Sequence, residues 1–228
     1  MDGTGAWPDV FTRCGARIGI ATCRFWFSQG RRNGVAPGGP RRRPAPHSLY
    51  KMGAMSNAPP EMTFVEYDAT YRKVFVRLTQ TVHSVLPSAD VEHVGSTSVP
   101  GLGGRGAIDA VLLSEPPDHA VILTALLQVA FTEFPYGPAK PALTTTLQLE
   151  GRDYVVLVYL LPRTHELVRS WLAFREYMLQ HPEEVERYAA IKRAAIAEGK
   201  TQPWTYQQAK TPYLAELAQR IACGSDSE

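Results

Sequence analysis

The sequence predicts an α+β protein with a small mixed β-sheet, helices packed on that sheet and a helical C-terminal part. Short apolar runs of strand length are interspersed with helical periods as far as Pro162. After Pro162 three helical segments follow one another with no strand-like run between them. Because strands and helices do not alternate regularly, a doubly wound fold is not expected.

The first expected element is a helix between residues 64 and 86, where apolar residues such as Val74, Leu78 and Val82 recur at a helical period. A hairpin turn is expected at Glu150–Asp153. Runs rich in apolar and β-branched residues predict strands at 91–94, 107–113, 143–149 and 154–161. Further helices are expected at 118–131, 171–180, 182–198 and 206–221.

Composition favours one folded domain without a membrane span. The chain has 228 residues, of which 44% are apolar, and no stretch approaches the roughly 20 apolar residues of a membrane helix. Residues 1–55 carry nine basic and two acidic side chains, whereas residues 56–228 carry 15 and 20. Since phosphate neutralisation needs clustered lysines and arginines, the mildly acidic domain is not expected to bind nucleic acid.

The first 55 residues hold nine glycines and five prolines, a composition that buries too little apolar area to fold. We therefore expect a basic leader at 1–55, one domain at 56–222 and a short tail at 223–228. Three interpretations of the leader are open: a disordered tail, an organelle transit peptide, or a segment absent from the natural protein if translation starts at Met52 or Met55.

The three cysteines, Cys14, Cys23 and Cys223, form no metal-type pair. We expect them to be free thiols in a reducing compartment, which favours a cytoplasmic location.

A Gly-Ser turn gives the domain its clearest chemical motif, in the segment His93-Val-Gly-Ser-Thr-Ser-Val-Pro-Gly101. A strand leads the chain into Gly95 and Ser96, and the hydroxyls of Ser96, Thr97 and Ser98 follow. Backbone amides and hydroxyls at such a turn suit phosphate oxygens, and Arg105 adds positive charge. The motif therefore predicts a phosphate-binding turn.

Asp109 lies in an otherwise apolar strand, Ala107–Leu113, where a lone buried carboxylate is costly. Holding a divalent metal such as Mg²⁺ beside a nucleotide phosphate is one reason for an acid there, and Asp109 is then the candidate metal ligand and catalytic residue. The alternative is that Asp109 ends the strand as an ion-pair partner of Arg105.

Three further residues are candidates for the same site. His93 either contacts a ligand or donates a hydrogen bond inside the core. Lys192 and Lys210 each follow a tyrosine by one helical turn, so their side chains either close over a triphosphate or lie on a solvated helix face.

The motif, a basic residue and Ile108-Asp109 together resemble the GrpB family, which is related to the DNA polymerase beta-like nucleotidyltransferase superfamily. Further segments agree, namely Leu172–Met178, His181–Tyr188 with Lys192, and Tyr206–Tyr213. The resemblance covers residues 61–222. It implies a nucleotidyltransferase-like fold, a nucleoside triphosphate, a small acceptor and Mg²⁺. Some family members are joined to dephospho-CoA kinase domains, but this sequence has no Walker motif.

The sequence departs from the superfamily at the residues that would hold metal ions. Val111 stands where a second acid is usual, and the run Tyr154–Leu161 contains no third acid. The Lys-Pro that usually precedes the acidic strand is Arg105-Gly106. Two functions therefore remain open: metal-dependent nucleotidyl transfer, or nucleotide or partner binding by a catalytically degenerate domain.

Overall fold

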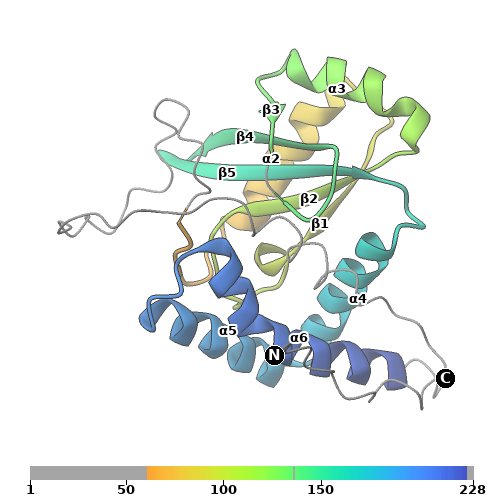
Figure 1. The fold of residues 1–228 in the computed structure, drawn as a ribbon. Helices are drawn as coiled ribbons and strands as arrows, with labels where there is room; N and C mark the ends of the chain where they lie inside the picture. Colours follow the sequence, from red (N-terminus) through yellow and green to blue (C-terminus); the bar gives the residue numbers. More distant parts are fainter. Residues whose placement is uncertain (1–60, 136, 225–228) are drawn as a thin grey trace, which may run out of the picture.

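The computed structural model describes residues 61–135 and 137–224, which form a five-stranded sheet between two groups of helices (Figure 1). The strand order is β1-β2-β5-β4-β3. Only β2 and β5 pair in parallel, and the other neighbours are antiparallel. The sheet is therefore mixed, which confirms the predicted α+β class. The strands are β1 (Asp90–Val94), β2 (Ile108–Leu113), β3 (Thr132–Glu133), β4 (Ala142–Leu149) and β5 (Arg152–Leu161).

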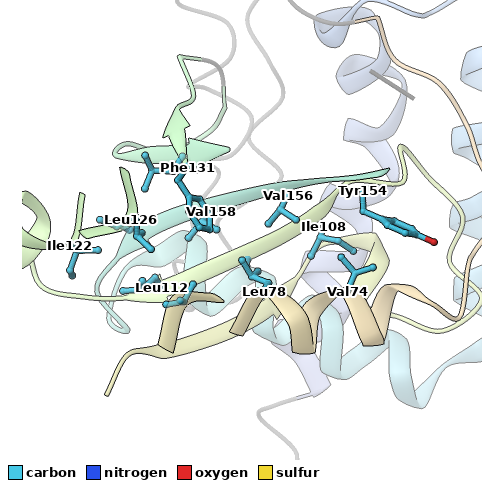
Figure 2. Close-up of a cluster of buried hydrophobic side chains, with 14 of the residues drawn as sticks. Val74, Leu78, Ile108, Leu112, Ile122, Leu126, Phe131, Tyr154, Val156 and Val158 are labelled. Atoms are coloured by element: carbon cyan, nitrogen blue, oxygen red, sulfur yellow. The ribbon is translucent and has the colours of Figure 1, made fainter. Parts of the chain in front are cut away.

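Two helices, α2 (Tyr71–His83) and α3 (His119–Leu127), pack on one face of the sheet. Their buried side chains meet alternate residues of β2 and β5, as Figure 2 shows for Val74 and Leu78 of α2 and Ile108 and Val156 of the strands. This cluster is the main hydrophobic core.

The opposite face of the sheet is covered by the C-terminal part, which consists of α4 (Glu166–Gln180), α5 (Pro182–Ala197) and α6 (Pro203–Gly224) (Figure 1). Side chains alternate between the faces of a strand, so Ile108, Ala110 and Leu112 of β2 point toward α2. Val111 packs on the α4 face with the first turn of α4. Asp109 shares that parity, and the strand therefore presents its one charged residue to the C-terminal helices.

The hairpin between β4 and β5 turns through only two residues, Glu150 and Gly151, because Leu149 already pairs with Arg152. Both turn residues have positive φ, 52° and 74°. A two-residue turn with both φ values positive matches the right-handed twist of the flanking strands.

The predicted first helix is too long at its N-terminal end, because α2 begins at Tyr71 and not at residue 64. Val65 instead forms an isolated bridge with Gly104, with reciprocal backbone hydrogen bonds of 2.7 and 2.9 Å. These long-range bonds satisfy backbone groups that a helix would have used locally.

Several other boundaries differ from the predicted ones. Helix α4 starts at Glu166, five residues early, and Nδ1 of His165 accepts a hydrogen bond from the Leu167 amide as its cap. Helix α6 spans Pro203–Gly224 and so extends beyond the expected helix at 206–221 at both ends. The short strand β3 was not predicted.

Helices α5 and α6 are joined by the carboxylate of Glu184, which is buried between them. It accepts hydrogen bonds from Tyr213 (2.7 Å) and from both terminal nitrogens of Arg220 (2.6 and 3.1 Å). The bonds from Arg220, with that from Tyr213, lower the pKa of Glu184 to about 2 against the cost of burial. The network fixes the positions of the two helices that carry Lys192 and Lys210.

The expected leader at 1–55, the first residues of the domain at 56–60 and the tail residues 225–228 lie outside the described residues. Across residues 61–135 and 137–224, no helix combines the length and the apolar character needed to cross a membrane.

Candidate functional site

A cavity of about 620 Å³ lies between the α4 face of the sheet and the C-terminal helices. This volume is within the range of small-molecule sites in proteins. The sheet contributes Val94, Asp109 and Tyr159, and the helices supply most of the rest of the wall. Of the nine site residues predicted from the sequence, the cavity wall contains Gly95, Ser96, Arg105, Asp109, Lys192 and Lys210.

Gly95 is a glycine because the turn passes directly over the Asp109 carboxylate. Its φ is 72°, and a β-carbon built on it would lie 2.9 Å from Oδ2 of Asp109. Gly104 has a similar role, since a β-carbon there would lie 2.8 Å from Oγ of Ser96 and 3.1 Å from Nζ of Lys192. These two close approaches bring the Gly-Ser turn, the acid and a lysine together.

Asp109 forms an ion pair with Arg105, and both side chains line the cavity. Nη2 of Arg105 lies 3.1 Å from Oδ1 and 3.5 Å from Oδ2 of Asp109, and each side chain is about a quarter exposed. Burial raises the pKa of Asp109, while the charges of Arg105 and Lys210 oppose that rise. The guanidinium therefore offsets the cost of placing the carboxylate on an apolar strand.

Two lysines reach the same cavity from different helices. Nζ of Lys192, which is 3% exposed, donates a hydrogen bond to the Gly103 carbonyl and lies 4.7 Å from the centre of the Tyr188 ring. Burial and the charge of Lys210 lower the pKa of Lys192 well below its usual value. Burial, and then repulsion from Arg105, lower the pKa of Lys210 to about 8, while Asp109 acts in the opposite direction.

His93, Thr97 and Ser98 do not line the cavity. The His93 ring stacks on Phe75 at 4.6 Å, on the α2 side of the sheet, and its Nε2 lies 3.0 Å from Oγ1 of Thr97. Burial, with the nearby charge of Arg175, lowers the pKa of His93 to about 4. Thr97 donates to the Ala107 carbonyl and Ser98 to the Gly95 carbonyl, so both hydroxyls brace the turn.

The donors around Asp109 do not fit a divalent metal ion. Within 61–135 and 137–224, no group of three or more His, Cys, Asp or Glu side chains is placed to hold one. Leu157 of β5 is the register partner of Asp109, and Tyr159 is that of Val111. Magnesium is usually held by one or two carboxylates together with waters and substrate phosphates. Here the single carboxylate is already paired with the Arg105 guanidinium, among apolar and aromatic side chains.

Sequence reasoning missed much of the helical wall, including Arg169, Ser170, Gln207 and Leu214. Trp171 and Phe174 pack against the buried clusters and also line the cavity. Spacing in the sequence places five of the α6 residues on one face of a helix, namely Gln207, Lys210, Leu214, Leu217 and Ile221. The helical spacing of these residues does not predict that this face borders a cavity.

The fold and cavity define an α+β protein whose C-terminal helices close over one face of a mixed sheet. A profile of the GrpB protein family matches residues 61–220, and this chain therefore belongs to the GrpB family.

Individual relatives agree with this assignment. A UPF0157 protein of Halalkalibacterium halodurans is 28% identical over 162 residues, which are 70% of this chain and 82% of that protein. The crystal structure of the conserved protein GrpB from Enterococcus faecalis aligns with a TM-score of 0.58 and 19% identity, over 72% of this chain and 99% of its own. The Cid1 poly(U) polymerase aligns at a TM-score of 0.40 with 12% identity, over 56% of this chain and 42% of its own, a likeness too slight to carry an argument.

The close approach of Gly95 to Asp109 is testable with a matched pair of substitutions. Gly95→Ala and Gly151→Ala both place a side chain at positive φ, 72° and 74°, but only the first meets another residue. We expect Gly95→Ala to lower the free energy of unfolding by at least about 1 kcal/mol more than Gly151→Ala, because the new methyl group overlaps the carboxylate. Denaturant unfolding of both variants measures the difference. Equal losses of unfolding free energy in the two variants would show that Gly95 is not in tight contact with Asp109.

Proposed function

We propose that this chain binds a phosphorylated small molecule through basic side chains and without a metal ion. The observation that carries the proposal is the Arg105–Asp109 ion pair, which places a guanidinium where metal-dependent enzymes place a cation. Lys192 and Lys210 line the same cavity, so among these four side chains three are basic and one is acidic. An arrangement of this kind favours an anion over a cation.

The Gly-Ser turn supports a phosphate as that anion. The turn reaches the cavity through Gly95 and Ser96, and its hydroxyls and amides are groups that bind phosphate oxygens. Resemblance of the motif to nucleotidyltransferases makes nucleoside phosphates the first class to test. The pocket is then a degenerate nucleotidyltransferase site that binds its ligand and needs no metal.

A second candidate is the metal-dependent transfer of a nucleotidyl group from a nucleoside triphosphate to a small acceptor. The observation that favours it is the partial exposure of Asp109, whose side chain is 22% exposed and lines the cavity beside the Gly-Ser turn. The donor set described above counts against it, because β2 has no second acid and the acid of β5, Asp153, is exposed and does not line the cavity.

Asp109→Asn separates the two candidates. In the first, the change removes the negative charge from an anion site and breaks the ion pair with Arg105, so nucleotide affinity in a chelator is unchanged or rises by up to about tenfold, or 1.4 kcal/mol. In the second, affinity depends on magnesium and falls by at least about tenfold. Calorimetric titration of the full chain with nucleoside triphosphates, with magnesium or with chelator, measures both.

Asp153→Asn is the matched control, since Asp153 is exposed on β5 and does not line the cavity. Binding that requires magnesium and weakens only in Asp109→Asn would contradict the proposal of metal-free binding.

The lowered pKa of Lys210 predicts that the affinity for nucleotides depends on pH. Its pKa of about 8 means that the ammonium loses its proton as pH rises through that value. Since only the charged form makes a charge-assisted bond to phosphate, we expect affinity to fall by about tenfold on raising the pH through 8. Lys210→Arg keeps its charge and flattens the profile, whereas Lys73→Arg on the exposed surface leaves it unchanged. A profile that is identical in all three proteins would remove Lys210 from the binding site.

A further inference from the structure

The cavity continues past the basic cluster along one face of α6. Its wall includes Lys210, Leu214, Leu217, Ala218 and Ile221, each of which lies three or four residues from another of the set, so that they share one side of the helix. At 1.5 Å per residue, Lys210 and Ile221 are separated by about 16 Å along the helix axis. The wall changes from basic to apolar over this length.

Helix α4 also lines the cavity, with Trp171 and Phe174 as its aromatic residues and Glu166, Arg169 and Ser170 as its polar ones. Trp171 packs on Tyr159 with ring centres 5.3 Å apart, and Phe174 meets the edge of Tyr188 at 5.8 Å. These contacts hold both rings in place. We call this part of the cavity the apolar arm, and define it by Trp171, Phe174, Leu214, Leu217, Ala218 and Ile221.

The side chains of the apolar arm suit a hydrocarbon better than a nucleobase. Apart from the indole nitrogen of Trp171, they carry no hydrogen-bonding group. A base placed among them would leave its ring nitrogens and exocyclic groups without partners, at a cost in affinity. A saturated or isoprenoid chain has no such groups, and it gains from leaving water.

We propose that the preferred ligand is an amphiphile, a phosphate ester whose head meets Arg105, Lys192 and Lys210 and whose apolar chain lies in the apolar arm. This inference rests on the proposed phosphate binding, because the head fixes the register of the chain. The exposed Ala218 lies among the bulky residues of the arm, and its small side chain leaves room there for a chain to enter.

A series of alkyl phosphates of increasing chain length tests the proposal. The full chain is titrated by calorimetry with inorganic phosphate, then with butyl, hexyl and octyl phosphate below their micelle concentrations. We expect the Kd to fall by about fourfold for each added methylene, which corresponds to roughly 0.8 kcal/mol, until the arm is filled. The octyl ester is expected to bind more tightly than ATP.

Two substitutions on α6 locate the chain. Ala218→Phe fills the arm and is expected to weaken octyl phosphate at least tenfold relative to butyl phosphate. Ala215→Phe introduces the same ring at an exposed position outside the cavity and is expected to leave the series unchanged. Because both positions are exposed, neither change removes a core contact.

The outcomes distinguish this inference from the proposed function. Phosphate binding with a Kd that is independent of chain length would overturn the amphiphile and leave phosphate binding in place. No binding of any phosphate, with or without a chain, would overturn both. Equal weakening of octyl phosphate in Ala218→Phe and Ala215→Phe would show that the chain does not enter the apolar arm.

Discussion

The ion pair between Arg105 and Asp109 is the interaction on which the candidate site depends. Asp109 is the one charged residue of β2, and the parallel pairing with β5 places it among apolar neighbours. A carboxylate in that position needs a cation, and Arg105 supplies it from the loop that leads into the strand. Gly95 then passes over the carboxylate at a distance that admits no side chain. Acid, guanidinium and turn therefore form one unit.

The C-terminal helices complete the site, and the packing of α5 against α6 brings two lysines into the cavity. Lys192 and Lys210 are far from β2 in the sequence, but α5 and α6 bring them to the same cavity. The buried carboxylate of Glu184 binds Tyr213 and Arg220 and so ties α5 to α6. Burial lowers the pKa of both lysines; the charge of Lys210 adds to this for Lys192, and the charge of Arg105 adds to it for Lys210, so an anion in the cavity would oppose both shifts.

Local sequence patterns were enough to predict the α+β class and most of the elements, because the strands of this sheet are short apolar runs and the helices have clear periods. The turn at Glu150-Gly151 was likewise visible in the sequence. The extended segment at residue 65 was not, because its pairing with Gly104 is a long-range contact that no local pattern encodes. The start of α4 was missed because His165 caps the helix with its ring, and histidine is not a usual cap residue.

The part of the candidate site that lies in the Gly-Ser motif was predicted, because its chemistry is encoded in a local sequence pattern. The motif predicted Gly95 and Ser96 because the amides and hydroxyls of such a turn suit phosphate oxygens. Asp109 was predicted because a lone carboxylate in an apolar strand is costly. The role of His93 was open, and its stacking on Phe75 depends on how α2 crosses the sheet. The apolar arm is the space between α4 and α6. Its existence depends on how the two helices pack, which the helical periodicity of their sequences does not predict.

The most direct measurement is a crystal structure of the full chain soaked with pyrophosphate and Mn²⁺, with anomalous data collected to locate the metal. Our account predicts pyrophosphate in contact with Arg105 and Lys210, with the Arg105–Asp109 ion pair retained and no anomalous peak beside Asp109. A manganese ion bound to the Asp109 carboxylate, with Arg105 displaced from it, would contradict the account and return the site to metal-dependent chemistry.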